Sequence, residues 1–343
     1  MDKLSNWEAR IGRRVRLRDL HILLTVVQHG SMAKAAVQLN VTQPAVSDAI
    51  ATLEAALGVR LLNRGRKGVE PTPYGAVLLK YGQLAIADLR QGVKEIEFLA
   101  DPTAGEVRVG CPDSIVNGLL VPTIKRLAER YPRVRVHVHQ FATPLYEFSD
   151  LEQGNVDVVL TRLSLGSAMS PALNVEELFD DHFCIVVGTQ SRLARRRKIE
   201  LADLVHERWI TTPTDVPVVV GRSSSRGNVA VQAAIQQVFL DAGLQPPEFV
   251  IITYSVFLRT TMVSSGEYVS TLPACVLRLH ADTLCELPIA LPLPPWWVAI
   301  VTSKNRALNP AAGLFIECVR EVANSIAPRG VVKEGKRGSR IVS

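Results

Sequence analysis

Residues 31–58 read SMAKAAVQLNVTQPAVSDAIATLEAALG and contain a short helical stretch, a break and a longer amphipathic stretch. Ser31 is a suitable N-cap for a first helix. Asn40 interrupts the helical pattern, Thr42 can cap a second helix, and Pro44 is tolerated in its first turn. Two short helices joined by a tight break are typical of a helix-turn-helix.

The second helix is expected to bury one side and expose the other. Its apolar residues recur at steps of four, three and four, which is the spacing of one helix face. Those residues are Val46, Ile50, Leu53 and Leu57. The opposite side has polar residues that could hydrogen-bond to base edges in a DNA major groove, namely Gln43, Ser47, Asp48 and Thr52. An ordinary helical hairpin is the alternative interpretation.

The flanking sequence favours DNA binding. Residues 18–28, RDLHILLTVVQ, predict a third helix with an apolar side. Gly58 is expected to end the second helix, and two short β-like runs follow it. Arg64, Arg66 and Lys67 lie between these runs, as expected for a hairpin wing beside a phosphate backbone.

At its N-terminal end the chain resembles the LysR-type transcriptional regulators. The resemblance is sharp over about residues 16–75 and rests on motifs in a fixed order: Ala35-Ala36, Gln43-Pro44-Ala45-Val46-Ser47, Leu53-Glu54, and the turn Gly58-Val59-Arg60-Leu61-Leu62-Asn63-Arg64. Leu62 replaces the usual Phe, and Asp48 stands where a basic or polar residue is common. A carboxylate near phosphates is repelled unless it accepts a hydrogen bond from a cytosine amino group.

This resemblance implies a DNA-binding site with two groups of residues. Thr42, Gln43, Pro44 and Ser47 would touch bases or the nearby backbone of double-stranded DNA. Phosphates would be held by a second group: Ser31, Arg64, Arg66 and Thr72.

Residues 73–99 predict one long connecting helix of about 40 Å, at 1.5 Å per residue. Its apolar residues recur close to heptad spacing, which suits packing against a second helix. They are Leu79, Ile86, Leu89, Val93 and Ile96. Packing against the protein's own body is the alternative, but the equivalent helix of the LysR-type family dimerises. The resemblance therefore implies a homodimer or homotetramer.

From Glu106 onward, short apolar runs alternate with helical stretches, which predicts a parallel sheet with helices on both faces. The predicted fold class is α/β, with an N-terminal all-α winged helix-turn-helix (1–72) and a linker helix (73–100). A two-lobed effector-binding domain (101–326), similar in fold to bacterial solute-binding proteins, would follow by resemblance. Lobe I would span about 105–173 and 268–326, lobe II about 174–267, and a basic tail 327–343.

Polar residues at predicted strand ends are candidates for binding an effector, because ligands of such sheets lie beyond the carboxyl ends of the strands. Hydroxyls at helix N-termini together with an arginine suit a small anionic or polyhydroxylated molecule. Simple N-capping is the alternative for each hydroxyl. The candidates are Ser114, Thr143, Thr161, Arg162, Ser224 and Ser225.

The charge of the chain is unevenly distributed. The formal net charge is +6, but residues 1–70 have 11 Lys and Arg against 6 Asp and Glu, and residues 327–343 have 5 against 1. A basic N-terminal end predicts a polyanionic partner whose binding weakens as salt rises. No apolar run approaches the ~20 residues needed to cross a bilayer. The first residues also lack the apolar middle of a secretion signal, so we expect a cytoplasmic protein without a membrane partner.

Motifs for catalysis or cofactors are not evident. The five cysteines form no C-x-x-C pair, so the sequence indicates neither a disulfide framework nor a zinc site. Gly330–Lys336 resembles a phosphate-binding loop, but Arg337 replaces its Ser or Thr. His137 and His139 lack a third metal ligand. We therefore expect no enzyme, cofactor or metal. The alternative function is a solute-binding or catalytic α/β protein whose N-terminal helices only mediate assembly.

Overall fold

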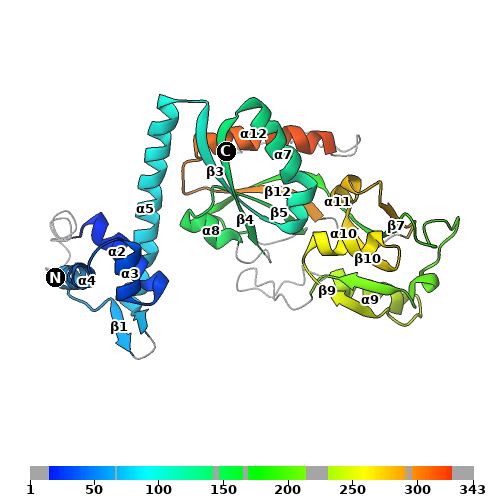
Figure 1. Cartoon of the computed structure of the whole chain (residues 1–343), viewed down its shortest axis with the longest axis horizontal. Helices are drawn as coiled ribbons and strands as arrows, with labels where there is room; N and C mark the ends of the chain where they lie inside the picture. The colour runs from blue at the N-terminus through cyan, green and yellow to red at the C-terminus, as the bar shows by residue number, and fades with distance from the viewer. Residues whose placement is uncertain are drawn as a thin grey trace, which may run out of the picture. The chain divides into compact units, whose positions relative to one another are not determined.

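The computed structural model describes residues 15–65, 68–141, 147–164, 169–213, 231–289, 291 and 296–326 (Figure 1). The chain divides into two compact units. The first comprises Met1–Glu97 and Glu152–Asn155, and the second comprises Phe98–Leu151 and Val156–Ser343.

From residue 15 onward the described part of the first unit has three helices and then a two-stranded hairpin, which confirms the predicted order of elements. They are α2 (Leu17–His29), α3 (Met32–Gln38), α4 (Gln43–Leu57), β1 (Leu62–Gly65) and β2 (Gly68–Pro71). Buried apolar side chains of the three helices form one core, together with Leu61 and Leu62 at the start of the hairpin. Gly58 ends α4 in the left-handed conformation with φ 70°, which glycine adopts without strain.

One residue, Thr72, separates the hairpin from the long helix α5 (Pro73–Ala100). Its first turn lies close to the residue that precedes β1. A Cβ atom at Gly75 would come within 2.0 Å of the carbonyl oxygen of Leu61. The absence of a side chain at Gly75 therefore allows the hairpin and α5 to pack together.

The second unit contains two five-stranded sheets. The first sheet has the order β4-β3-β5-β12-β6, in which β4 and β5 run parallel to β3 while β12 is antiparallel to both of its neighbours. Its strands are β3 (Ala104–Pro112), β4 (Arg133–Phe141), β5 (Val158–Ser164), β6 (Leu173–Asp180) and β12 (Trp296–Ser303).

Helices cover both faces of the first sheet, as the alternating pattern predicts. Buried side chains of α7 and α12 pack on one face, where Leu160 of β5 lies. Leu151 of α8 packs on the other face beside Val159. The helical segments of this lobe are α6 (Asp113–Ile115), the π-helical turn η1 (Val116–Leu120), α7 (Val121–Arg130), α8 (Glu147–Gln153) and α12 (Pro310–Ile326).

The second sheet has the order β11-β7-β10-β8-β9. Cys184 and Val186 of β7 face a core shared with α10 and α11, while Ile185 and Val187 face a separate core with Trp209 and α9. Its strands are β7 (Phe183–Gly188), β8 (Arg208–Thr211), β9 (Phe249–Ile252), β10 (Tyr268–Pro273) and β11 (Leu284–Glu286). Its helices are the 3-10 turn η3 (Leu201–Leu204), α9 (Val231–Asp241), α10 (Val256–Ser264) and α11 (Ala274–Leu279).

The sheets correct the predicted boundary between the lobes. The strand β6 belongs to the first sheet, whereas the sequence pattern puts residues 174–180 in lobe II. Conversely, β10 and β11 pair with β7 in the second sheet, whereas residues 268–286 are predicted for lobe I. Both sheets are mixed rather than parallel. An apolar run identifies a strand but not its partner, because pairing depends on residues distant in the sequence.

Four of the five cysteines are buried and Cys285 is half-buried, and all five are free thiols. A buried free thiol packs as a small apolar side chain. His137 and His139 lie exposed on the edge strand β4. Among the described helices, none is both long and apolar enough to cross a membrane.

Candidate functional site

Hydroxyl caps begin the two helices of the helix-turn-helix. The Ser31 hydroxyl accepts a hydrogen bond from the backbone N–H of Lys34, and that of Thr42 accepts one from Ala45, both at 3.4 Å. Asn40, between the two helices, has a left-handed φ of 53°. Each capping hydroxyl acts only as an acceptor in these bonds, so its hydrogen is left to donate to a phosphate oxygen.

Gln43 and Pro44 lie exposed on the first turn of α4. On the other side of the helix, Val46 and Ile50 are completely buried, as the apolar spacing predicts. The structure thus leaves the polar start of α4 open to a partner, while the apolar face holds the helix in place.

Ser47 is less available than the sequence suggests. Its side chain is half-buried, and its hydroxyl donates to the sulfur of Met32 at 3.4 Å. Asp48, the next residue, is exposed. A carboxylate therefore lies beside the expected base-contacting surface, which restricts the bases that this part of α4 can accept.

The β1–β2 hairpin is attached to the turn before α3. The backbone N–H of Val69 donates to the carbonyl oxygen of Gly30 at 2.9 Å. Arg64 lies exposed on β1, opposite Val69. Arg66 and Lys67 lie outside the described residues. The hydrogen bond to Gly30 therefore fixes the hairpin, and Arg64 with it, to the turn that precedes α3.

Glu54 has a structural role that its place in a sequence motif does not reveal. Its Oε1 atom accepts hydrogen bonds from the backbone N–H groups of Leu61 at 2.7 Å and Leu62 at 3.3 Å. The carboxylate therefore satisfies backbone donors of the turn between α4 and β1.

The hydroxyl of Thr72, a predicted phosphate contact, has hydrogen-bond partners inside the protein. Its hydroxyl donates to the carbonyl oxygen of Arg60 at 2.7 Å and accepts from the backbone N–H of Gly75 at 3.1 Å. The residue is only 8% exposed. Thr72 therefore caps α5 and ties it to the residue before the hairpin.

In the second unit, Arg162 of β5 takes part in a buried network. Its Nε and Nη2 atoms donate to Oδ2 of Asp181 at 3.0 and 2.6 Å, and Nη1 donates to the hydroxyl of Ser114 at 2.6 Å. Nη2 also lies 3.1 Å from the sulfur of Cys275. The charge of Arg162, a predicted effector contact, is therefore already balanced by Asp181 inside the protein.

The protonation of this network follows from burial and proximity. Burial by itself raises the pKa of Asp181, but the adjacent Arg162 guanidinium and the hydrogen bonds from Cys275 together lower it more, so that the pKa lies below its ordinary value. Burial by itself lowers the pKa of Arg162, but Asp181 and Cys275 together raise it above its ordinary value. Burial raises the pKa of the Cys275 thiol to about 12. The network is therefore an ion pair beside a neutral thiol.

Asp113 joins the two lobes at the carboxyl end of β3. Its Oδ2 atom accepts a hydrogen bond of 2.6 Å from the backbone N–H of Val256, at the start of α10. Its Oδ1 atom accepts a 3.4 Å bond from the side-chain amide of Gln140. A carboxylate at a helix N-terminus is stabilised by the unpaired N–H groups there. Asp113 thus occupies a position that suits an anion.

Arg259 is a buried cation that the sequence analysis missed. It is 3% exposed, and its Nη1 atom donates to the carbonyl oxygen of Thr271 at 3.0 Å. Its Nε atom is buried without a hydrogen-bond partner in the described part of the chain. Burial lowers its pKa to about 10, although the charge of Asp113 opposes this shift. No sequence motif distinguishes Arg259 from a surface arginine on an amphipathic helix.

Two threonine hydroxyls are likewise buried without a hydrogen-bond partner in the described part of the chain. Thr161 on β5 and Thr211 at the end of β8 are completely buried, and within the described residues neither Oγ1 atom has a hydrogen-bond partner. Of the predicted effector residues, the structure thus brings Ser114 and Arg162 together and buries Thr161. The other three, Thr143, Ser224 and Ser225, lie outside the described residues.

A separate pocket of about 420 Å³ opens beside Cys275. Gly118, Lys125, Arg126 and Arg278 contribute to its lining. Of the predicted effector residues that the structure describes, Ser114, Thr161 and Arg162, none lines this pocket.

The chain is similar to known regulators along nearly its whole length. The protein-family model of the LysR substrate binding domain matches residues 100–324, and the model of the bacterial regulatory helix-turn-helix protein, lysR family, matches residues 17–76. The HTH-type transcriptional regulator GbpR of Azospirillum brasilense is 24% identical over 94% of this chain and 90% of its own length.

Two solved structures share the fold. Full-length OxyR from Pseudomonas aeruginosa matches with a TM-score of 0.62 and 21% identity, over 93% of this chain and 99% of its own. Full-length CbnR in complex with its target DNA matches with a TM-score of 0.60 and 20% identity, over 90% and 100% of the two chains.

Proposed function

Because this chain belongs to the LysR family of helix-turn-helix transcriptional regulators, we propose that the first turn of α4 contacts the base edges of double-stranded DNA. The observation that carries this proposal is the exposed pair Gln43 and Pro44 at the start of a helix whose other face is buried. In helix-turn-helix proteins, the N-terminal residues of the second helix reach the bases. Gln43 is the side chain best suited to specify a base, since an amide can pair with adenine.

Phosphates are contacted by the groups around this turn. Arg64 on the hairpin supplies a positive charge. The hydroxyls of Ser31 and Thr42 accept hydrogen bonds as helix caps, so their hydrogens can donate to phosphate oxygens. Arg66 belongs to the same group by its place in the sequence. We assign Ser47 a smaller role and Thr72 none, because their hydroxyls already have partners inside the protein.

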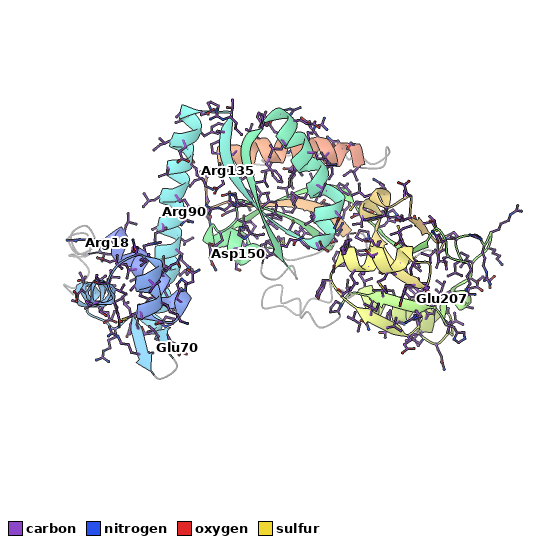
Figure 2. All side chains as sticks on the ribbon, in the orientation of Figure 1. Arg18, Glu70, Arg90, Arg135, Asp150 and Glu207 are labelled. Carbon is purple, nitrogen blue, oxygen red and sulfur yellow. The ribbon has the colours of Figure 1, made fainter. Side chains whose placement is uncertain are left out.

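Gln43→Ala and Arg64→Ala should separate the two kinds of contact. We expect Gln43→Ala to reduce the preference for the target sequence over random duplex by about 1–3 kcal/mol. Arg64→Ala should weaken binding to target and random duplex alike. It should also reduce the steepness of the plot of log affinity against log salt concentration by about 1. Fluorescence anisotropy at several salt concentrations measures both effects. Arg90→Ala on α5 is the matched charge control (Figure 2). An equal loss on target and random DNA for Gln43→Ala, or a loss confined to target DNA for Arg64→Ala, would contradict the assignment.

The effector site lies between the lobes, near the start of α10. The support comes from three buried polar atoms without described partners, Thr161 Oγ1, Thr211 Oγ1 and Arg259 Nε, and from Asp113 on the N-terminus of α10. An unpaired buried polar group costs about 1–3 kcal/mol, so a ligand that satisfies these atoms gains affinity. A small molecule with hydroxyl or carboxylate groups has the required chemistry.

Thr161→Val and Thr211→Val test this site without removing a charge. Replacing a buried, unpaired hydroxyl with a methyl group should leave the free protein as stable or more stable. The same variants should lose at least part of the thermal stabilisation that sugars, sugar acids or aromatic acids give to the wild-type chain. An effector whose stabilisation is unchanged in both variants binds elsewhere, and the pocket beside Cys275 would then be tested with Arg126→Ala.

The oligomer forms through α5. Leu89, Val93 and Ile96 are 53%, 54% and 69% exposed along one side of this helix, at the spacing of a helix–helix seam. Burying them against a second copy gives a homodimer, and two dimers give a homotetramer. A dimer presents two copies of α4 to two half-sites, which are separated by about one helical turn of DNA or a multiple of it.

This function places the protein in the bacterial cytoplasm, where its DNA target lies. The family is one of transcriptional regulators, and we assign no catalytic role to the described residues. The alternative, a solute-binding or catalytic protein that uses its N-terminal helices for assembly, predicts that added salt leaves the retention of the protein on duplex DNA unchanged.

A further inference from the structure

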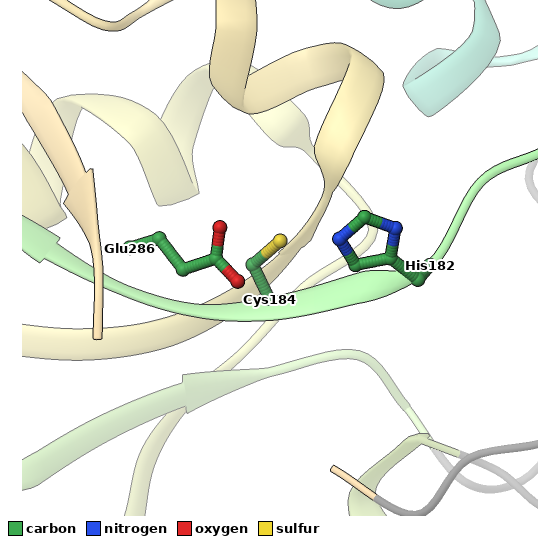
Figure 3. Close-up of side chains that lie close together, drawn as sticks. All are labelled: His182, Cys184 and Glu286. Carbon is green, nitrogen blue, oxygen red and sulfur yellow. The ribbon is translucent and has the colours of Figure 1, made fainter. Parts of the chain in front are cut away.

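Three potential metal ligands meet on the second sheet. The side chains of His182, Cys184 and Glu286 each offer one ligand atom, and these atoms all lie within 4.8 Å of one another. Figure 3 shows the Cys184 sulfur between the imidazole ring of His182 and the carboxylate of Glu286. The sequence separates Glu286 from the other two by about a hundred residues, so no spacing motif reveals the group.

The positions of the three residues follow from strand geometry. His182 directly precedes β7 and is two residues from Cys184, so the two side chains share one face of an extended chain. Antiparallel pairing of β11 with β7 puts Glu286 opposite Val186, which lies on the same face as Cys184. Ligands on paired strands are held more rigidly than ligands on loops.

The donor set suits a particular class of ion. Imidazole nitrogen, thiolate sulfur and carboxylate oxygen are the ligands that Zn²⁺ and similar divalent transition metals use in proteins. In a tetrahedral site with these bond lengths the ligand atoms lie about 3.5 Å apart. The exposed side chains of His182 and Glu286 can close the remaining distance by rotating toward the buried sulfur.

We propose that His182, Cys184 and Glu286 bind one divalent transition-metal ion of the Zn²⁺ type. The thiol loses its proton to solvent when the sulfur–metal bond forms, and the other two groups donate lone pairs without further change. Three protein ligands leave a fourth position for water or for a small ligand. The site is distinct from the proposed effector site, whose atoms come from β5, β8 and α10.

The ion would stabilise the segment that connects β6 of the first sheet to β7 of the second. His182 directly follows Asp181, which pairs with Arg162, and its own carbonyl oxygen accepts a 2.9 Å hydrogen bond from Ala274 at the start of α11. Fixing the His182 side chain to β7 and β11 therefore restrains the segment that connects the first sheet to the second. This is a structural reason for metal to affect the stability of the second unit.

Titration of the full-length, reduced protein with Co²⁺ tests the site directly. We expect one Co²⁺ per chain, a sulfur-to-cobalt charge-transfer band in the near ultraviolet, and loss of the spectrum when Zn²⁺ is added. Cys184→Ser should abolish the charge-transfer band. His182→Ala and Glu286→Gln alter exposed residues and should weaken Co²⁺ binding at least about tenfold, since even outer-sphere changes have effects of that size.

Two matched controls distinguish this group from other thiols and imidazoles. Cys285 is adjacent to Glu286 on β11, but its side chain lies on the other face of the sheet. His206 is exposed in the same lobe. Cys285→Ser and His206→Ala should bind Co²⁺ with wild-type affinity and spectrum. The proposal is overturned if the wild-type protein shows no charge-transfer band, or if the band survives Cys184→Ser or is unaffected by both His182→Ala and Glu286→Gln.

Discussion

The pair Arg162–Asp181 has the lowest solvent exposure of the ion pairs in the described part of the chain, at 6% and 1% for the two side chains. Two charges in such a place stabilise the fold only together, because each has lost its hydration. The backbone N–H of Cys275 completes the pair by donating to Asp181 Oδ1 at 2.9 Å. The network therefore connects β5 of one lobe with the start of α11 of the other.

Asp181→Asn should destabilise the protein by about 3–5 kcal/mol, because it leaves the Arg162 charge buried without a counterion. Urea unfolding followed by circular dichroism measures the change. Glu176→Gln is the control, since its pair with Arg320 is 42–50% exposed and such pairs contribute about 0–1 kcal/mol. Similar losses of unfolding free energy in the two variants would show that the buried Asp181 pair contributes no more to stability than the exposed Glu176 pair.

The pH dependence of stability follows from the same residue. The pKa of Asp181 is lower in the folded protein than in the unfolded chain, so its contribution is present above the unfolded value of about 3.9. That contribution is lost as pH falls through the lower, folded pKa. We therefore expect the free energy of unfolding to decline below about pH 4, with a smaller decline in Asp181→Asn. Equal slopes for wild type and variant in acid urea titrations would contradict this.

Gly75→Ala should destabilise the first unit by about 1–3 kcal/mol or more, because the new Cβ would lie 2.0 Å from the backbone oxygen of Leu61. Gly92→Ala is the control on the same helix, since outside the helix's own backbone no atom of the described residues lies within 4 Å of its added Cβ. Alanine in an open helix position should stabilise by about 0.4–1 kcal/mol. Thermal unfolding monitored through the first unit would show opposite shifts, and shifts of the same sign would count against the packing argument.

At the scale of elements, α4 and α5 differ in how their surfaces are used. The apolar face of α4 is buried within its own unit, so its exposed turn is free to carry specificity. By contrast, α5 has large exposed side chains along its length, including Tyr74, Tyr81 and Leu99 at 61%, 62% and 82%. A helix of this kind reaches its stable state only when a partner covers the apolar side.

Charges on that side of α5 should prevent association. Val93→Glu combined with Ile96→Glu is expected to convert the oligomer to a monomer and to weaken binding to a two-half-site operator at least about tenfold, since the two heads would no longer act together. Lys80→Glu is the control, because at about 100° per residue it projects opposite Leu89. Analytical ultracentrifugation measures the state, and an unchanged oligomer in the double variant would exclude α5 as the interface.

At the scale of the whole molecule, the second unit has two sheets but one shared main core. The largest hydrophobic cluster takes in Val109 and Val298 of the first sheet and Val186 and Leu272 of the second. Asp113 and Arg162 add polar links between the same lobes. A core that draws on both sheets makes the stability of one lobe depend on the other.

The two lobes should therefore unfold in one cooperative transition. In hydrogen-exchange mass spectrometry at increasing urea, peptides from β5 and from β7 are expected to lose protection at the same denaturant concentration. The separate core around Trp209 and Phe239 makes lobe II the part that would open first if the coupling were weak. Earlier exchange of β7 than of β5 would show that the shared core does not join the lobes.

Local sequence patterns determined the first unit of this protein almost completely. Helix caps at Ser31 and Thr42, the break at Asn40 and the apolar spacing of α4 act over a few residues, so they are readable without a structure. They put Gln43 and Pro44 on the exposed first turn of α4. Tertiary structure alone decided the roles of Thr72, Arg162 and Arg259, the strand partners of β6 and β10, and the meeting of Cys184 with Glu286. Burial and pairing depend on contacts between distant segments, and a single sequence does not record them.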